Sequence, residues 1–271
     1  MIVTDKFGDV TRIKMGHELG GKVLYWVSVY FIDGLLIDTG PSHASMELAR
    51  FMEGKTLDGA INTHYHEDHV GGNYLLMEKF GIEIFAHREA VPYIKNPPPI
   101  LEYQKSVWGE ARGSSALPVG NRVKTGRFAF EIIDIPGHSR GDIALFEPMM
   151  RWCFSGDLFI TERPKTARRE EDVLEMLSSM KKLLALDGGD FTLFTSGEGV
   201  FPEGREALGV CVAHLEKIGR RARALYGQKK EIEDIVTEMF GRETSLATLT
   251  DGDFSSANLI RSILGLKKEK P

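Results

Sequence analysis

Short runs of apolar residues divide the first part of the chain into strand-like and helix-like segments. Residues 23–32 are mostly apolar and β-branched, and a second run at 34–38 follows a turn at Asp33-Gly34. Further apolar runs predict buried strands at 60–63, 82–86, 128–135, 143–146, 152–154 and 191–195. Helical spacing predicts helices at 44–52, 73–79, 88–94 and 170–186. This mixture of strands and helices allows either a doubly wound sheet or a sandwich.

The segment 92–118 has a different character from its surroundings. It contains three consecutive prolines at 97–99 and a Gly-Ser-Ser stretch at 113–115, which predicts an irregular excursion over the surface. The same segment carries the large side chains Tyr93, Tyr103, Trp108 and Arg112. Two roles stay open for it: to cover a site and contact substrate, or to form an ordered surface insertion.

Beyond residue 204 the apolar spacing becomes helical throughout and shows no strand pattern. It predicts three amphipathic helices at 204–226, 231–240 and 255–265. Gly241 and Gly265 mark helix ends, and Ser255 is placed to cap the start of the third helix. We therefore expect a domain at 1–203 and a helical appendage at 204–271 that packs on it.

The amino-acid composition limits the classes of protein to which this chain can belong. A chain of 271 residues with 42% hydrophobic residues can bury the core of one domain and a small appendage. The formal net charge of −5 gives no general attraction to nucleic acid or to an anionic membrane. Cys153 and Cys211 are too few for a disulfide framework, which fits a reducing cytosol. Without a signal-like start or an apolar run of roughly 20 residues, we expect a cytoplasmic protein with no membrane segment.

The strongest chemical signal is a cluster that follows the predicted strand at 60–63. Three of the eight histidines, His64, His66 and His69, fall within six positions beside Asp68. A loop at a strand end can aim His64 and His66 toward one point, while Asp68 and His69 reach a second point nearby. Imidazole nitrogens suit zinc and iron, and a carboxylate adds oxygen ligation. The cluster predicts a metal site.

The sequence around this cluster resembles a known family. Residues 63–72 read Thr-His-Tyr-His-Glu-Asp-His-Val-Gly-Gly and resemble the T-H-x-H-x-D-H-x-G-G signature of the metallo-β-lactamase superfamily, especially its thioester-hydrolysing glyoxalase II-like branch. Three further matches occur in the family's order: Leu-Ile-Asp-Thr-Gly at 36–40, Pro-Gly-His-Ser at 136–139 and Ser-Gly-Asp-Leu at 155–158. The resemblance covers roughly residues 20–200. It implies an α/β (α+β) fold, a four-layer αββα sandwich with a C-terminal helical appendage and metals at one edge of the two sheets.

The resemblance also implies a ligand set for two divalent ions, with zinc the expected metal. His64, His66 and His138 would form the first site, and Asp68, His69 and a bridging Asp157 the second. Asp38 would hydrogen-bond to the loop that carries these ligands.

One position departs from the family pattern. The usual closing Gly-His reads Gly197-Glu198 here. We favour Glu198 as an oxygen ligand, which would suit manganese or iron at the second site. The alternative is that Glu198 does not bind and leaves this site weak or empty.

The remaining candidate residues are expected to be structural. We do not expect His17, His43, His87 or His214 to bind metal, and His214 lies inside a predicted helix. Cys153, in an apolar strand, is expected to be a small buried residue.

The implied chemistry is hydrolysis by a hydroxide held between two metal ions, because metal binding lowers the pKa of water from 15.7 to about 7. Asp68 would position this hydroxide and accept its proton, so no Ser-His-Asp triad is required. The first hypothesis is a hydrolase of a small ester, thioester or lactone. The oligomeric state stays open, and loops outside the motifs set the small-molecule substrate.

Three other functions remain open. A nuclease acting on RNA or DNA is disfavoured by the acidic balance, although Arg220-Arg221 and Lys229-Lys230 form a small basic cluster. A mononuclear-iron enzyme similar to persulfide dioxygenases would need only His64, His138 and Asp157. A binding module without catalysis is the least favoured, because the ligand set is intact.

Overall fold

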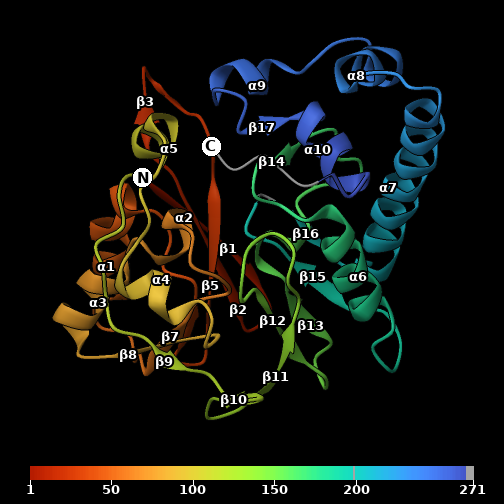
Figure 1. Cartoon of the computed structure of the whole chain (residues 1–271). Coiled ribbons are helices and arrows are strands. Elements are labelled where there is room, and N and C mark those ends of the chain that lie inside the picture. The colour runs from red at the N-terminus through yellow and green to blue at the C-terminus, as the bar shows by residue number, and fades with distance from the viewer. Residues whose placement is uncertain (198, 267–271) are drawn as a thin grey trace.

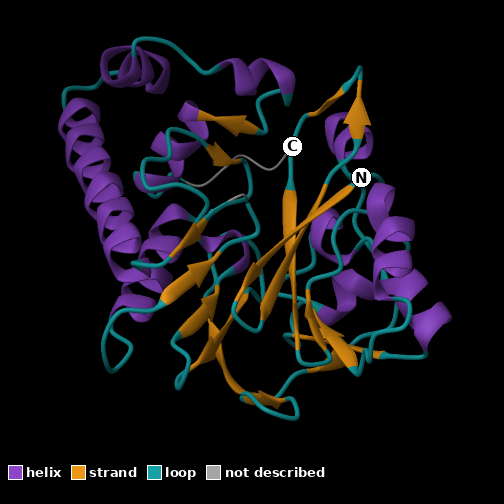
Figure 2. Ribbon diagram, turned by 180° about the vertical axis from the view of Figure 1, so that it is seen from behind, coloured by secondary structure: helices purple, strands orange, loops and turns teal. Residues whose placement is uncertain are grey.

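Two β-sheets face each other and helices cover both outer faces, as Figures 1 and 2 show. The computed structural model of the protein describes residues 1–197 and 199–266. One sheet has seven strands in the order β1-β2-β5-β6-β7-β8-β9, and the other has six in the order β10-β11-β12-β13-β15-β16. Two further pairs, β3-β4 and β14-β17, form small ribbons.

The strands are short and follow the chain order closely. The first sheet contains β1 (Ile2–Phe7), β2 (Val10–Met15), β5 (Val27–Ile32), β6 (Leu35–Ile37), β7 (Gly59–Ile61), β8 (Glu83–Ala86) and β9 (Leu117–Pro118). The second contains β10 (Arg122–Lys124), β11 (Ala129–Asp134), β12 (Ile143–Glu147), β13 (Trp152–Phe154), β15 (Thr192–Phe194) and β16 (Val200–Phe201). The ribbons consist of β3 (Glu18–Leu19) with β4 (Lys22–Val23), and β14 (Ala167–Arg168) with β17 (Phe254–Ser255).

The helices divide between the two sheets in chain order. On the side of the first sheet lie η1 (Ser42–Ala44), α1 (Ser45–Met52), α2 (Glu67–Val70), α3 (Asn73–Phe80), α4 (Val91–Lys95) and α5 (Glu102–Val107). On the side of the second sheet lie η2 (Gly156–Leu158), α6 (Val173–Leu184), α7 (Gly204–Gly227), α8 (Ile232–Phe240), α9 (Ser245–Leu249) and α10 (Ser256–Ile263). No helix of the described residues is both long and apolar enough to cross a bilayer.

Alternate residues of the central strands enter different hydrophobic cores. In β12, Ile143 and Leu145 pack between the sheets, whereas Ala144 and Phe146 face the helices. In β6, Leu36 likewise faces helices α1 and α3 while its neighbours point between the sheets. Both faces of these central strands are therefore buried, which is why they read as continuous apolar runs rather than as alternating patterns. The result is four layers, and the predicted αββα sandwich is confirmed.

Most predicted elements are present, with boundaries displaced by a few residues. The long strand predicted at 23–32 begins only at Val27, because the residues before it form the β3-β4 ribbon. The helix predicted at 88–94 is reduced to α4. The segment 92–118 is less irregular than predicted, since it holds helix α5 and ends in strand β9, which pairs with β8. The N-terminal hairpin β1-β2 extends the first sheet beyond the predicted strands.

The three long helices of the C-terminal part occur where the apolar spacing predicts them. Ser255 caps α10 by accepting a hydrogen bond from the backbone N–H of Asn258, as predicted. The prediction of no strand in this part is wrong, because Phe254 and Ser255 form β17 and pair with β14. The helices share one core with the second sheet, in which Leu215 of α7 and Leu193 of β15 are both buried. The division at residue 203 stays a prediction.

This shared core makes the stability of α7 testable. We expect Leu215→Ala to lower the free energy of unfolding by about 2–5 kcal/mol, because it leaves a cavity in a closed core. In urea, the helical circular dichroism signal and the tryptophan fluorescence should shift together, since Trp152 lies on the other face of the same sheet.

The matched control is Leu249→Ala, at a leucine that is 72% exposed, which should change stability by no more than about 0.5 kcal/mol. Loss of the helical signal at a lower urea concentration than the fluorescence change would contradict the shared core.

Candidate metal centre

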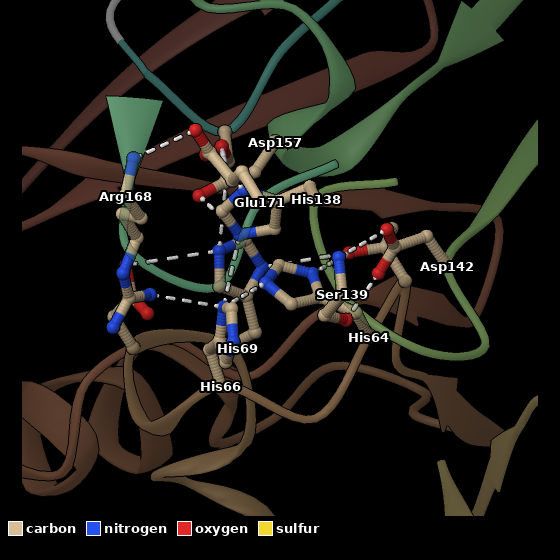
Figure 3. A network of polar contacts seen from close by, with 12 residues as sticks. His64, His66, His69, His138, Ser139, Asp142, Asp157, Arg168 and Glu171 are labelled. Atoms are coloured by element: carbon tan, nitrogen blue, oxygen red, sulfur yellow. Dashed lines mark hydrogen bonds and ion pairs between the residues drawn. The ribbon is translucent and has the colours of Figure 1, made fainter. Parts of the chain in front are cut away.

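Four strands end beside one another and place the motif residues on the loops that follow. Asp38 comes directly after β6, and His64 follows β7, which pairs in parallel with β6. His138 follows β11 and Asp157 follows β13 in the opposite sheet. The carboxyl ends of parallel neighbours meet at one edge of a sheet, so these loops converge at the edge of the sandwich. Figure 3 shows the resulting cluster.

Asp38 fixes the conformation of the loop that carries the histidines. Its carboxylate accepts hydrogen bonds from the Thr63 backbone N–H at 2.7 Å and from the Thr63 hydroxyl at 2.8 Å. It also lies 2.8 Å from Nδ1 of His69. The predicted contact between Asp38 and this loop is therefore present. Asp38 adopts a left-handed backbone, with φ of 61°, which aspartate tolerates better than most residues other than glycine.

The two glycines at the end of the motif allow the loop to approach the first sheet. A Cβ atom on Gly72 would lie 2.5 Å from the backbone oxygen of Thr39. A Cβ atom on Gly71 would lie 2.3 Å from the backbone nitrogen of Ser42. Any larger residue at either position would force the histidine loop away from the strand end.

Three imidazole rings point their nitrogens at one another. Nδ1 of His66 lies 3.0 Å from Nε2 of His64 and 2.9 Å from Nε2 of His138. These side chains are buried. Three ring nitrogens that meet at one point cannot all find partners by sharing protons, whereas one cation can accept all three lone pairs.

A second group adjoins the first through Asp157. One carboxylate oxygen of Asp157 lies 3.3 Å from Nε2 of His69, and the other lies 3.4 Å from Nε2 of His138. Asp68 lies 3.7 Å from the same His69 nitrogen. Nε2 of His69 is buried and has no hydrogen-bond partner among the described residues. The geometry thus brings together the six described residues that the sequence predicts as ligands.

The electrostatics of these residues fit cation binding. Burial holds the pKa of His64 and of His66 well below the usual value, so both rings present neutral lone pairs. Burial would also lower the pKa of His138, but Asp157 and Glu171 raise it to about 9. Burial would lower the pKa of His69 too, but carboxylates led by Asp38 raise it well above its usual range. Metal binding at this centre would replace protons that the carboxylates now hold on the rings.

Two sets of ligand atoms lie close enough to hold an ion. Within His64, His66 and His138, and within His64, His69 and Asp157, one ligand atom of each residue lies within 4.8 Å of the others. Nitrogen and carboxylate donors of this kind suit zinc, iron or manganese. Neither set includes a residue beyond 204, and Glu198, the remaining predicted ligand, lies outside the described residues.

Sequence reasoning missed two carboxylates that lie beside histidines of the cluster. Glu171 lies 2.7 Å from Nδ1 of His138 and also accepts a hydrogen bond from the backbone of Arg168. A carboxylate behind a metal-binding histidine, as Glu171 is behind His138, fixes the ring orientation and raises ligand basicity. Glu170 lies 3.0 Å from Nε2 of His66, a nitrogen without a hydrogen-bond partner among the described residues. In the sequence, these acids belong to a charged run at 168–172 that resembles an ordinary solvated segment.

Arg168 is the second omission, and it lies beside the histidine cluster. Its Nη1 atom is 3.2 Å from Nδ1 of His66, and the residue is 6% exposed. The segment 92–118 also contacts the loop that carries the histidines, because Gln104 donates a hydrogen bond to Glu67 at 2.7 Å. This segment therefore touches the metal-binding loop, as one of its two predicted roles requires. Nothing in the spacing of the sequence signals the Arg168 contact.

The other histidines lie outside the two sets of ligand atoms. His43 packs against His17 and contacts the backbone oxygen of Lys105 at 2.8 Å. His214 contacts the backbone oxygen of Pro164 at 3.0 Å, and His87 lies 3.6 Å from Asp134. Cys153 is fully buried, as predicted.

Residues 137–141 read Gly-His-Ser-Arg-Gly and match the Gly-x-Ser-x-Gly pattern of serine hydrolases. The hydroxyl of Ser139 donates to Asp142, whose carboxylate also accepts from the Ser139 backbone N–H at 2.6 Å. The serine lies between strands β11 and β12 rather than at a strand-to-helix turn. It therefore lacks both the base and the backbone setting of a catalytic serine, and no triad is formed here.

Comparison with known proteins identifies relatives of this chain. The sequence profile of the Metallo-beta-lactamase superfamily matches residues 27–191. The hydroxyacylglutathione hydrolases of Brucella ovis and Brucella abortus are 32% identical over 172 residues, which cover 62% of this chain and 58% of each relative. The aligned region thus spans less than two thirds of these relatives.

Solved structures share the fold at lower sequence identity. A beta-lactamase domain protein from Burkholderia ambifaria has a TM-score of 0.73 and 17% identity, covering 97% of this chain and 88% of that chain. A metallo-beta-lactamase family protein from Thermus thermophilus has a TM-score of 0.68 and 16% identity, covering 95% of this chain and 93% of that chain.

The role of Asp38 leads to a prediction about metal affinity. Asparagine tolerates the left-handed backbone and keeps one acceptor, but it removes the charge beside His69. We expect Asp38→Asn to weaken zinc binding by about 10- to 100-fold while the fold is retained. Competition with a chromophoric chelator measures the affinity, and circular dichroism checks the fold.

Asp187→Asn, at an exposed aspartate, is the matched control and should leave zinc affinity unchanged. Equal affinities of the Asp38→Asn protein and the parent would show that Asp38 does not support the ligand loop.

Proposed function

This chain belongs to the metallo-β-lactamase superfamily, and we propose that it is a metal-dependent hydrolase of a small thioester. The observation that carries the proposal is the position of Asp157, whose two oxygens face one histidine of each ligand group. A carboxylate in this place suits two adjacent divalent ions. Esters and lactones are the related substrates that the same site could hydrolyse.

We assign the residues as follows. His64, His66 and His138 hold one ion, Asp68 and His69 hold the other, and Asp157 bridges them. Glu198 is proposed as a further oxygen ligand of the second ion. Zinc is the expected metal, and iron or manganese suits the second site if Glu198 binds.

When bound, the two ions would supply a hydroxide nucleophile near neutral pH and polarise the carbonyl of the substrate. Asp68 is 5% exposed and lies 3.7 Å from Nε2 of His69, where it can orient the attacking oxygen and accept its proton. The attacking oxygen forms a bond to the carbonyl carbon and the carbon–sulfur bond breaks. The thiolate then takes up a proton, so that one water yields an acid and a thiol.

The choice of a thioester comes from the relatives. The Brucella proteins are named hydroxyacylglutathione hydrolases, and their similarity to this chain extends over 172 residues. Because the alignment leaves a large part of each relative uncovered, the acyl and thiol groups of the substrate are not carried over.

Two alternatives have less support. For a nuclease, the basic cluster of the C-terminal helices should be free for phosphate, but Arg221 and Lys230 are both paired with Glu238. For a mononuclear-iron dioxygenase, Asp68 and His69 would serve no ligand role, although both are buried beside Asp157.

Activity tests the proposal directly. We expect metal-dependent hydrolysis of thioesters that a chelator abolishes and that added zinc or manganese restores. Asp68→Asn should lower kcat/KM by about 10²-fold or more, because it removes the group that positions the nucleophile. The matched control, Asp187→Asn, should match the parent enzyme.

Hydrolysis that survives both the chelator and Asp68→Asn would place the chemistry elsewhere. Metal-dependent cleavage of RNA, or oxygen uptake by a protein with one iron per chain, would instead support one of the alternatives.

The role of Glu198 is tested by exchanging the metal. Glu198→His should shift metal preference from manganese toward zinc, because it replaces an oxygen donor with a nitrogen donor. Elemental analysis after loading with an equimolar mixture of both ions measures the preference. An identical metal profile in the parent and the variant would rule out Glu198 as a ligand.

A further inference from the structure

Arg168 is a buried cation beside the proposed metal centre and belongs to none of the ligand motifs. Its guanidinium Nη1 atom lies 3.2 Å from Nδ1 of His66, one of the three converging ring nitrogens. Figure 3 shows the side chain reaching the histidine cluster from the strand that carries it. A group held in this position is next to any substrate atom that approaches the metal ions.

The C-terminal part of the chain holds Arg168 in place. Strand β14, which contains Arg168, pairs with β17 so that Arg168 lies opposite Phe254. The guanidinium carbon lies 5.5 Å from the centre of the Phe254 ring. Asp253 places a carboxylate oxygen 3.5 Å from Nε of Arg168, and the Tyr103 hydroxyl donates to that same oxygen at 2.6 Å. Segments from three distant parts of the chain thus meet at this one side chain.

The protein uses few of the hydrogen-bond donors of this guanidinium. Nε of Arg168 is buried without a hydrogen-bond partner among the described residues. Asp253 at 3.5 Å and Glu170 at 3.6 Å balance its charge at distances too long for strong hydrogen bonds. The one hydrogen bond of its side chain within the described residues goes to His66 Nδ1, the atom that a metal ion would take. A buried charged group with unused donors is costly unless a ligand supplies the missing acceptors.

The two neighbouring carboxylates differ in how firmly they are held. The Asp253 side chain is 10% exposed and is fixed by Tyr103, whereas the Glu170 side chain is 45% exposed. An entering anion can therefore displace Glu170 toward solvent while Asp253 keeps the guanidinium oriented.

From this arrangement we propose that Arg168 binds a carboxylate of the substrate close to the scissile bond. The planar guanidinium offers paired N–H donors that match a carboxylate, which a lysine could not do. The inference rests on the proposed function and narrows its substrate to a thioester whose acyl group carries a carboxylate. Asp253 acts through Arg168 and is a positioning residue.

Two thioesters of the neutral thiol N-acetylcysteamine test this inference. Succinyl and butyryl thioesters have acyl chains of the same length, and only the first ends in a carboxylate. We expect the enzyme to prefer the succinyl thioester by about 10- to 100-fold in kcat/KM, the range of a hydrogen-bonded charged group. Arg168→Gln should reduce that preference to no more than about threefold, mainly by raising KM for the succinyl substrate.

Arg169→Gln is the matched control. Arg169 is the next residue, is exposed, and donates to the backbone oxygen of Asp251. This variant should keep the full preference for the succinyl thioester. Asp253→Asn should raise KM for the succinyl thioester with little change in kcat, because it loosens the guanidinium without removing it.

A binding measurement tests the same contact without turnover. Calorimetry on the zinc-loaded protein should detect succinate binding that is at least about tenfold weaker in Arg168→Gln than in the parent and unchanged in Arg169→Gln. Zinc content, measured for each protein, should stay the same. If Arg168→Gln does not fold, Arg168→Lys and Asp253→Asn provide the same comparison.

The outcomes separate this inference from the proposed function. A parent enzyme that hydrolyses both thioesters equally, or an Arg168→Gln variant that loses both activities in the same proportion, would overturn the carboxylate site and leave the thioesterase standing. A parent that hydrolyses neither thioester but binds succinate through Arg168 would overturn the thioesterase and leave the carboxylate site standing.

Discussion

The structure depends on the convergence of buried ring nitrogens and carboxylates at one edge of the sandwich. His64, His66 and His138 direct three nitrogens at one point, and Asp157 connects them to His69. Such a group is stable only if the loops that carry it are held rigidly and if a cation satisfies the lone pairs. The sheets meet the first requirement, because the residues follow strands β7, β11 and β13, and β7 and β13 are buried along their whole length. The packed layers therefore support the four loops that follow β6, β7, β11 and β13.

What the sequence predicts well is local in the chain. The cluster from His64 to His69 occupies six positions, so its composition alone indicates metal binding, and the short motifs around His138 and Asp157 add their ligands by resemblance. The amphipathic helices can be predicted equally well, because each buries one apolar stripe in the core that the helices share with the second sheet and repeats the same spacing along its length. Their ends at Ser255 and Gly241 follow from cap and backbone preferences that a single residue expresses.

What the sequence does not predict arises from contacts between distant segments. Strands β14 and β17 have two residues each, too few for any periodicity, and they exist because 167–168 and 254–255 pair across the molecule. Helix α5 is short and is joined to the metal-binding loop by the bond from Gln104 to Glu67. Glu171 and Arg168 stand in a charged run that local patterns assign to solvent, yet both are oriented toward His138 and His66. Only the tertiary fold distinguishes these residues from surface charges.

Different segments of the chain therefore supply the metal-binding groups and the surroundings of Arg168. The loops at the strand ends supply the groups that can bind metal, whereas the surroundings of Arg168 come from α5, β14 and β17. Ser255 connects helix α10 to the surroundings of Arg168. It caps α10, and in the β14-β17 ribbon it pairs with Ala167, the neighbour of Arg168. The stability of α10 is therefore linked through β17 to the position of the guanidinium. If Arg168 binds the substrate as proposed, the C-terminal helices contribute to substrate selection through this contact, although none of their described residues is among the candidate metal ligands.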